Sequence, residues 1–476
     1  MTTNLISTTV DQAVTAAVAA ALPARHASDA ERARWLTAAA DALDANTAEL
    51  VALADNETHL GTARLTGEVG RTTGQLRLFA SVITEGSYLE AVIDHADSTT
   101  TPPRPDLRRV LIPLGPVAVY AASNFPFAFS VAGGDTASAL AVGCPVVVKA
   151  HPGHVATSRR VAEIVTQALE AVGAPAGVFS LVEGYQEGID LVEHPGITAA
   201  AFTGSVAGGR ALADRAAARP APIPFFGELG SINPVVVTAT ADTVRGDVLA
   251  TGLAGSFTLG AGQFCTKPGI VFVPENSRLE AELPGAVTAA PAQMLTDGIA
   301  EKFVEGIRAV GDVDGVDTLT VSSGAGDPAL FAVNADTFLA HHKVLGAEVF
   351  GPTTLLVRYS DETELLRALE VVEGSLTATL HAEEGDDVTE VLDALVDRSG
   401  RVLFAGWPTG VAVLWAQQHG GPWPATTTQH TSVGATATRR FQRPVAFQDA
   451  PDHLLPAALR EDNPLKVPRR VDSVVE

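Results

Sequence analysis

Hydrophobic residues recur at helical spacing over the first part of the chain. Ser28, with Glu31 three positions later, fits the capping box that begins a helix. The apolar positions that follow, mostly three or four residues apart, are Trp35, Leu36, Ala39, Leu43, Leu50 and Leu53. This spacing predicts an amphipathic helix, and a second helix is predicted over residues 70–79.

The pattern changes near residue 108, where short apolar runs of β character alternate with helical stretches. The predicted strands are 117–120, 145–149, 178–182 and 199–202, and the predicted helices are 132–140, 156–172 and 188–192. This alternation is typical of parallel βαβ units in an open α/β sheet, and it resumes after Pro234. Residues 95–107 are polar and hold three prolines, which favours a connection or an exposed hairpin. We therefore expect a two-lobed α/β protein with its site between the lobes.

Composition narrows the class of protein. The 476 residues carry 32 Lys and Arg against 55 Asp and Glu, a net charge of −23, which argues against nucleic acid or an anionic membrane as the main partner. Two cysteines cannot build a disulfide framework, so a cytoplasmic location is expected. The Ala-rich stretch 13–21 lacks the positive flank of a signal peptide, and no apolar run approaches the roughly 18 residues of a membrane span. The twelve histidines show no metal-ligand spacing, so no metal site is predicted.

Cys265 is the candidate nucleophile of this chain. It lies in the glycine-bounded run 262–269, and loops of this kind present reactive groups, while glycines allow a ligand to approach the backbone. Cys144 precedes an apolar strand and fits a small buried hydrophobe instead. Glu228 stands alone among aromatic residues and glycines, which predicts a raised pKa suited to a general base. The alternative for Glu228 is an ordinary exposed loop residue.

Polar residues at predicted strand ends are further candidates. Asn124 could donate to a developing oxyanion or simply form a turn. Lys149 places a cation where α/β folds bind nucleotides, with a solvated surface lysine as the alternative. Residues 203–205 end a strand and open a helix, whose free N–H groups suit a pyrophosphate. The run 324–329 matches a GxGxxA fingerprint, but Pro328 interrupts the helix that this motif requires.

Six runs, taken in order along the chain, resemble the aldehyde dehydrogenase superfamily. They are 123–126 (Ser-Asn-Phe-Pro), 148–149 (Val-Lys), 202–205 (Phe-Thr-Gly-Ser), 228–230 (Glu-Leu-Gly), 262–265 (Gly-Gln-Phe-Cys) and 348–352 (Glu-Val-Phe-Gly-Pro). Together they are specific to the superfamily, and the resemblance covers nearly the whole chain. The chain is most similar to the 2,5-dioxopentanoate (α-ketoglutarate semialdehyde) dehydrogenase branch. The runs similar to that branch are 70–79, 129–136, 149–152, 228–234, 419–424 and 443–448.

The resemblance implies a fold and an assembly. It implies an α/β fold of two Rossmann-like open-sheet domains plus a small oligomerisation hairpin. The cofactor-binding domain would span residues 1–94 and 114–233, and the catalytic domain would span residues 234–445. Residues 95–113 and 446–476 would form the oligomerisation elements of a homodimer or homotetramer.

The resemblance also implies a mechanism, in which an aldehyde is oxidised to an acid through a thioester on Cys265. Asn124 and the Cys265 N–H would stabilise the oxyanion, and Glu228 would activate the hydrolytic water. The implied NAD or NADP contacts are Lys149, Thr203, Gly204, Ser205, Glu348 and Phe350. Many strictly NAD-dependent members carry a glutamate three residues after the lysine, and Pro152 at that position favours NADP.

The sequence constrains the substrate less than it constrains the chemistry. A keto-acid semialdehyde carries a carboxylate, which favours a cation in its pocket. Arg71 and Gln75 share a helix face and are candidates for that contact, with a salt link between helices as the alternative. Phe127, Phe264 and Trp423 are candidate pocket walls. A fatty or other aldehyde is the alternative substrate, and a cysteine hydrolase without a cofactor is the alternative activity.

Overall fold

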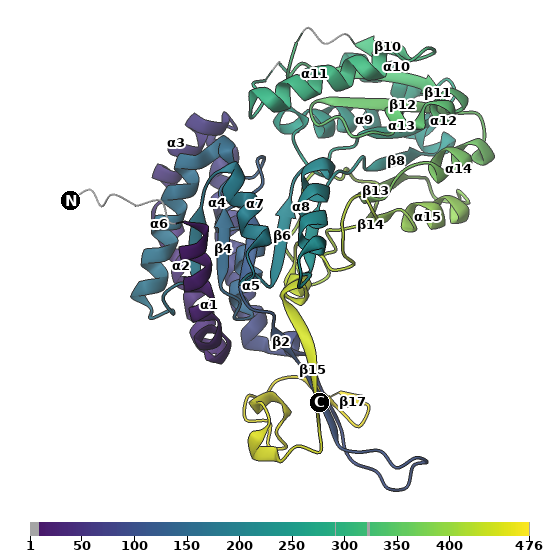
Figure 1. The fold of residues 1–476 in the computed structure, drawn as a ribbon. Helices are drawn as coiled ribbons and strands as arrows, with labels where there is room; N and C mark the ends of the chain where they lie inside the picture. Colours follow the sequence, from purple (N-terminus) through teal and green to yellow (C-terminus); the bar gives the residue numbers. More distant parts are fainter. Residues whose placement is uncertain (1–8, 291, 321–323, 476) are drawn as a thin grey trace.

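Two α/β lobes and an extended arm make up the fold (Figure 1). The computed structural model describes residues 9–290, 292–320 and 324–475. Within these ranges, no helix combines the length and the apolar character needed to cross a bilayer. The prediction of a two-lobed α/β protein is confirmed.

The sheet of the first lobe is parallel throughout, in the order β5-β4-β3-β6-β7. Its strands are β3 (Val117–Tyr120), β4 (Val146–Lys149), β5 (Phe179–Val182), β6 (Ala199–Thr203) and β7 (Phe225–Glu228). One face is covered by α1 (Val10–His26), α7 (Tyr185–Glu193) and α8 (Val206–Ala218). The other is covered by α2 (Asp29–Ala45), α3 (Thr47–Thr58), α4 (Thr62–Glu85), α5 (Gly134–Ala141) and α6 (Val155–Ala171). Successive strand residues point to opposite faces, so Val119 and Tyr120 lie in different cores.

Sequence patterns located these elements closely. The capping box forms, because Ser28 Oγ accepts from the Glu31 N–H at 3.3 Å and the Glu31 carboxylate accepts from the Ser28 N–H at 2.7 Å. The helix predicted over 70–79 is longer than expected and runs until Gly86, whose φ of 92° is left-handed and ends it.

The second lobe has a seven-stranded sheet in the order β10-β11-β12-β9-β8-β13-β14, antiparallel between β10 and β11 and parallel elsewhere. The strands are β8 (Pro234–Val237), β9 (Ile270–Pro274), β10 (Asp317–Thr320), β11 (Ala329–Asn334), β12 (Thr353–Tyr359), β13 (Ser375–His381) and β14 (Ser399–Phe404). The helices of one face are α9 (Ala239–Thr258) and α10 (Arg278–Ala286). Those of the other are α11 (Asp297–Gly311), α12 (Ala335–Ala340), α13 (His342–Leu345), α14 (Glu362–Glu370) and α15 (Thr389–Val396). The GxGxxA run leads into strand β11 rather than a helix.

The arm is a sheet in the order β15-β2-β1-β16-β17. Its strands are β1 (Ala91–Asp94), β2 (Leu107–Pro113), β15 (Gln442–Gln448), β16 (Arg469–Val471) and β17 (Val474–Val475). The hairpin expected over 95–107 is present, with Asp97 bridged to Arg104. The arm also takes in β1 and the start of β15, beyond the expected 95–113 and 446–476.

The segment between β14 and β15 returns from the second lobe to the first. It ends in the 3-10 helix η4 (Ala435–Phe441), whose Ala435, Ala437 and Phe441 lie in the first-lobe core. The other 3-10 helices are η1 (Ser87–Leu89), η2 (Pro152–His154), η3 (Leu259–Gly262), η5 (Asp452–Leu454) and η6 (Ala457–Leu459). The end of the expected catalytic range 234–445 therefore packs with the first lobe, and it carries residues toward the carboxyl end of β7.

Candidate active site

The loop of Cys265, between η3 and β9, is fixed by buried side chains. The Asn233 amide donates to the carbonyls of Cys265 at 2.8 Å and Lys267 at 2.9 Å. The Lys267 ammonium donates to two carbonyls of segment 349–353, at 3.0 and 2.8 Å. Gly262 has a φ of 65°, and a Cβ there would lie 2.2 Å from that segment's backbone. This glycine was expected to admit a ligand, but it admits a neighbouring chain segment.

Asn124 reaches the same loop from the first lobe. It follows β3, is buried, and its Nδ2 donates to the Gln263 carbonyl at 3.1 Å. Its own carbonyl accepts from Arg64 at 2.7 Å, which holds the backbone of Asn124 in place. Among the described residues, no acceptor takes the N–H of Cys265. The Asn124 amide and the free Cys265 N–H thus both lie at the loop that carries the thiol.

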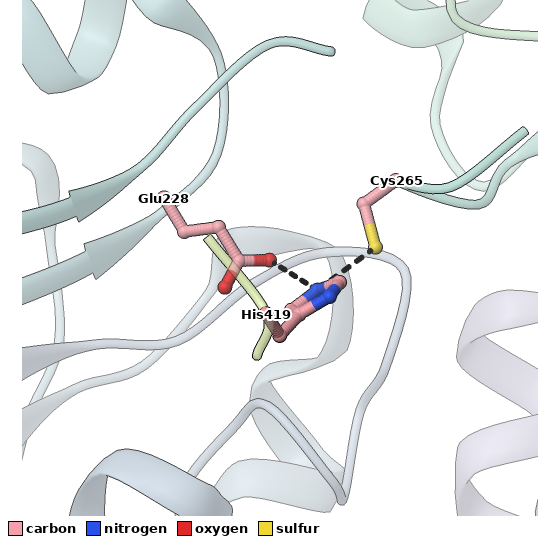
Figure 2. Close-up of side chains that lie close together, drawn as sticks. All are labelled: Glu228, Cys265 and His419. Atoms are coloured by element: carbon pink, nitrogen blue, oxygen red, sulfur yellow. Dashed lines mark hydrogen bonds and ion pairs between the residues drawn. The ribbon is translucent and has the colours of Figure 1, made fainter. Parts of the chain in front are cut away.

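His419 joins Glu228 and Cys265, although sequence reasoning gave it no role. Its Nε2 lies 2.9 Å from Glu228 Oε1 and 3.6 Å from Cys265 Sγ, and Figure 2 shows the ring between them. We call these residues the Cys–His–Glu triplet. One polar atom from each of the three side chains lies within 4.8 Å of the other two. His419 is 154 residues from Cys265 in sequence, so no local spacing connects them.

Glu228 is not the isolated carboxyl that the sequence predicted. Its Oε2 accepts from Ser432 Oγ. Burial alone would raise the pKa of Glu228, but the positive charge of His419, together with the hydrogen bond from Ser432, lowers it. The predicted raised pKa is therefore wrong, because the sequence could not show that a cation faces this carboxylate.

The His419 ring carries the complementary charge. Burial alone would lower the pKa of His419, but the Glu228 carboxylate and Cys265 raise it to about 10. The ring has no exposed surface. Near neutral pH the triplet therefore contains a buried imidazolium–carboxylate pair beside the sulfur of Cys265.

The candidate nucleotide residues lie at the carboxyl edge of the first-lobe sheet. Lys149 ends β4, and its ammonium has no hydrogen-bond partner within the described ranges. Burial lowers the pKa of Lys149, and the charge of Glu187 opposes this shift. Thr203 ends β6 beside Glu228 in the ladder, and the Gly204 N–H donates to the Glu228 carbonyl at 3.0 Å.

Ser205 is the N-cap of α8, a helix of 13 residues, and its hydroxyl accepts from the Gly208 N–H at 3.3 Å. The remaining first-turn N–H groups of α8 are available to an anion. A free ammonium and an open helix start, at the ends of the two strands that flank β3, fit the phosphates and ribose of a dinucleotide.

Glu348 and Phe350 belong to the loop before β12. Glu348 is exposed over much of its surface, yet its carboxylate turns inward and accepts from the Ser231 N–H at 3.3 Å. Burial of that carboxylate raises the pKa of Glu348 to about 7, and the charge of Lys267 opposes this. The chain itself therefore engages this carboxylate, which was expected to hold a ribose. Phe350 is half-buried beside it.

Arg71 is a half-buried cation whose inner nitrogens lack partners. Its guanidinium lies over the rings of Phe125 and Phe129, 5.5 and 5.1 Å from their centroids. Its Nε and Nη2 are buried without a hydrogen-bond partner within the described ranges. Burial lowers the pKa of Arg71, and the charge of Cys265 opposes this shift. The Phe129 ring beside the guanidinium also packs beside the His419 ring, with centroids 6.3 Å apart, so Arg71 lies close to the triplet. No salt link from Arg71 to another helix occurs among the described residues.

Gln75 and Phe127 are placed differently from what was expected. Gln75 is buried and donates to the Ala128 carbonyl at 3.3 Å, so its Nε2 supports the loop after β3. Phe127 is 2% exposed and packs in the first-lobe core. Phe127 is therefore a core residue, because Glu68 binds its backbone N–H at 2.8 Å and holds this turn of the loop inward.

Phe264 and Trp423 lie in contrasting settings. Phe264 packs edge-on against Phe125 at 5.5 Å, with the Arg64 guanidinium 4.7 Å from its centroid. Trp423 is 49% exposed and stacks near Arg210 of α8, at 5.8 Å. The arginine–aromatic cluster comprises Arg64, Arg71, Phe125, Phe129 and Phe264.

Known proteins resemble this chain in sequence and in fold. The profile of the aldehyde dehydrogenase family matches residues 3–303. Alpha-ketoglutaric semialdehyde dehydrogenase 2 of Azospirillum brasilense is 49% identical over 475 residues, covering 95% of this chain and 90% of that protein. Alpha-ketoglutaric semialdehyde dehydrogenase of Acinetobacter baylyi is 43% identical, covering 98% and 91%. The solved NADP-dependent glyceraldehyde-3-phosphate dehydrogenase from Bacillus halodurans C-125, complexed with NADP, shares the fold with a TM-score of 0.78 at 22% identity, covering 93% and 91%.

Proposed function

Because this chain belongs to the aldehyde dehydrogenase family, we propose that it oxidises 2,5-dioxopentanoate (α-ketoglutarate semialdehyde) to 2-oxoglutarate. The names of two relatives that match nearly the whole chain support this substrate. The observation that carries it in the structure is Arg71, a half-buried arginine with two buried, unpartnered guanidinium nitrogens close to the triplet. Burying such donors without acceptors is costly, and a substrate carboxylate would satisfy them.

The chain's own residues would divide the chemistry. The Cys265 sulfur attacks the aldehyde carbon, and the Asn124 amide and the Cys265 N–H stabilise the oxyanion. NAD(P), when bound, supplies the hydride acceptor. Glu228 then takes a proton from the water that hydrolyses the thioester, and the acid leaves.

We propose that Lys149, Thr203, Gly204 and Ser205 hold the dinucleotide and that NADP is preferred over NAD. The free ammonium of Lys149 and the open start of α8 support the site. Pro152 in place of a carboxylate supports NADP, since nothing at that position repels a 2′-phosphate. Glu348 and Phe350 would reach the nicotinamide end once the Glu348 carboxylate leaves its inward position.

A steady-state screen tests the proposal. We expect reduction of cofactor, followed at 340 nm, with 2,5-dioxopentanoate well ahead of succinic semialdehyde and of a long-chain aldehyde, and a lower KM for NADP than for NAD. A preference for the long-chain aldehyde would instead support the fatty-aldehyde alternative.

A cysteine hydrolase without a cofactor is a second candidate. The Cys–His–Glu triplet favours it, since a cysteine beside a histidine and a carboxylate suits acyl transfer. Ester hydrolysis without any change at 340 nm on mixing aldehyde and cofactor would support it.

We also propose a division of labour among the domains. Residues 1–94 and 114–233 would bind the cofactor, residues 234–445 would carry the nucleophile, and residues 95–113 and 446–476 would join copies in a homodimer or homotetramer. The projecting arm sheet supports the last point, because its edge strand β15 offers unpaired backbone groups. Light scattering would measure the assembly.

A further inference from the structure

The proposed function leaves His419 without a task, yet this ring contacts both the nucleophile and the base. Its Nε2 is within hydrogen-bond geometry of Cys265 Sγ at 3.6 Å. Glu228 Oε1 is 2.9 Å from the same nitrogen but outside hydrogen-bond geometry, so that contact is ionic (Figure 2). One nitrogen therefore faces the sulfur while the carboxylate stabilises positive charge on it.

The position of the ring is fixed by its own segment. The backbone N–H of His419 donates to Thr431 Oγ1 at 2.8 Å, and the backbone carbonyl of His419 accepts from the Ser432 N–H at 2.9 Å. The ring packs beside Phe129 with centroids 6.3 Å apart. Its Nδ1 is buried without a partner among the described residues, so the polar contacts of the ring there run through Nε2, to Cys265 and Glu228.

The other charged groups around the triplet are arginines from separate elements. Burial lowers the pKa of both Arg71 on α4 and Arg401 on β14, and the charge of Cys265 opposes this shift in each. Arg440 on η4 acts on Glu228 and pairs with Asp135 at 2.7 Å. Cations on several sides favour negative charge on the sulfur and in the carboxylate.

We propose that His419 is a catalytic residue that accepts the thiol proton of Cys265, while Glu228 holds the resulting imidazolium. This inference rests on the proposed function only in taking Cys265 as the nucleophile. The S–H bond breaks and an N–H bond forms at Nε2, so thiol and imidazole become thiolate and imidazolium without any change of oxidation state. Such a pair keeps a cysteine reactive near neutral pH before aldehyde or cofactor arrives.

Alkylation of Cys265 by iodoacetamide, in the presence of EDTA and without cofactor or aldehyde, measures this directly. Cys144 has 0% exposure and serves as the silent thiol in mass spectra. We expect His419→Gln, which keeps a polar atom but accepts no proton, to slow alkylation roughly ten- to a hundredfold near pH 6.5 and to approach the native rate above about pH 9. The matched control is His430→Gln, an exposed histidine of the same segment, whose rate should not change. Equal rates for His419→Gln and the native protein near pH 6.5 would overturn the proposal.

The native protein alone gives a second test that does not depend on a variant's folding. We expect its alkylation rate to change little between about pH 6.5 and 8, whereas an ordinary thiol gains about tenfold per pH unit below its pKa of about 8.5. A native profile of that ordinary kind refutes the role of His419. Because no aldehyde is present, an active dehydrogenase whose alkylation ignores His419 contradicts this inference alone, while an aldehyde-inactive protein with a His419-dependent profile contradicts the proposed function alone.

Discussion

The Cys–His–Glu triplet and the arginine–aromatic cluster are two buried charged regions beside one thiol, and they differ in how their charges are satisfied. In the triplet, Glu228 faces a cation at 2.9 Å and a hydroxyl from Ser432. In the cluster, the arginines face aromatic rings, and Arg71 keeps two buried nitrogens unpartnered within the described ranges. The opposite charges of the triplet offset each other without a ligand, although His419 Nδ1 is unpartnered within the described ranges, whereas the two unpartnered Arg71 nitrogens belong to a cation that no carboxylate pairs with at salt-bridge distance in those ranges.

The cost of burying a charge explains why the two regions suit different roles. An aromatic face stabilises a cation by about 0.5–2 kcal/mol, which falls short of the several kcal/mol that burial of an ion costs. The shortfall at Arg71 would be removed by an anionic ligand, whereas Glu228 and His419 already offset each other. The triplet therefore suits chemistry, which needs fixed geometry, and the cluster suits recognition, which needs unused donors.

Replacing the thiol is the largest expected change. Cys265→Ala should lower kcat by about 10⁴-fold or more, because the covalent route is lost. NADP binding should survive, since Lys149 and α8 lie on the other lobe, and fluorescence titration would measure it. Full activity in this variant would refute the role of the triplet altogether.

Replacing Arg71 should affect recognition instead of chemistry. Arg71→Met should raise KM for 2,5-dioxopentanoate roughly ten- to a hundredfold, the loss of a charged hydrogen bond worth about 1.5–3 kcal/mol, with little effect on an uncharged aldehyde. Arg77→Met is the matched control, because Arg77 is on the same helix but pairs with Asp41 at 2.6 Å on the surface. Equal losses for charged and uncharged aldehydes would show that Arg71 is structural.

The sequence predicted the fold far better than it predicted which charged side chains pair. Strand and helix limits follow from local periodicity, so β3 occupies the predicted 117–120 and α6 differs from its prediction by one residue at each end. The pairing of His419 with Glu228 depends on a segment that returns between lobes, and no spacing encodes it. The prediction of Phe127 as a pocket wall failed in a similar way. Only the geometry of the loop shows that its ring turns into the first-lobe core.

The pH dependence of stability tests whether the charges of His419 and Glu228 offset each other in the folded protein. The pKa of His419 rises from about 6.5 in the unfolded chain to about 10 in the folded protein. The native state then binds more protons between these values, so the contribution is full below about pH 6.5 and is lost as pH rises toward 10, by at most about 1.4 kcal/mol per pH unit. Glu228 has a lowered pKa, so its contribution is lost in acid. If the His419 proton comes from Cys265, the unfolded chain keeps an equivalent proton on its thiol up to about pH 8.5. Urea unfolding should therefore show the downward slope between about pH 8.5 and 10, and His419→Gln should remove it. An unchanged slope would contradict the buried ion pair.

Lys149 lies between the two extremes and gives the smallest expected effect. Its ammonium has no hydrogen-bond partner among the described residues, yet the charge of Glu187 acts on it. Glu187 is exposed on α7, so solvent screens the interaction, and such pairs are worth about 0.2–1 kcal/mol.

Removing the Glu187 carboxylate should leave Lys149 more available to a 2′-phosphate. We expect Glu187→Gln to raise the ratio of kcat/KM for NADP over NAD by about two- to fivefold. Asp190→Asn, one turn further along α7, is the matched control and should leave the ratio unchanged. A ratio that falls in Glu187→Gln would mean that this carboxylate holds Lys149 in place for the cofactor, which would make Lys149 a paired cation like His419 rather than an open one like Arg71.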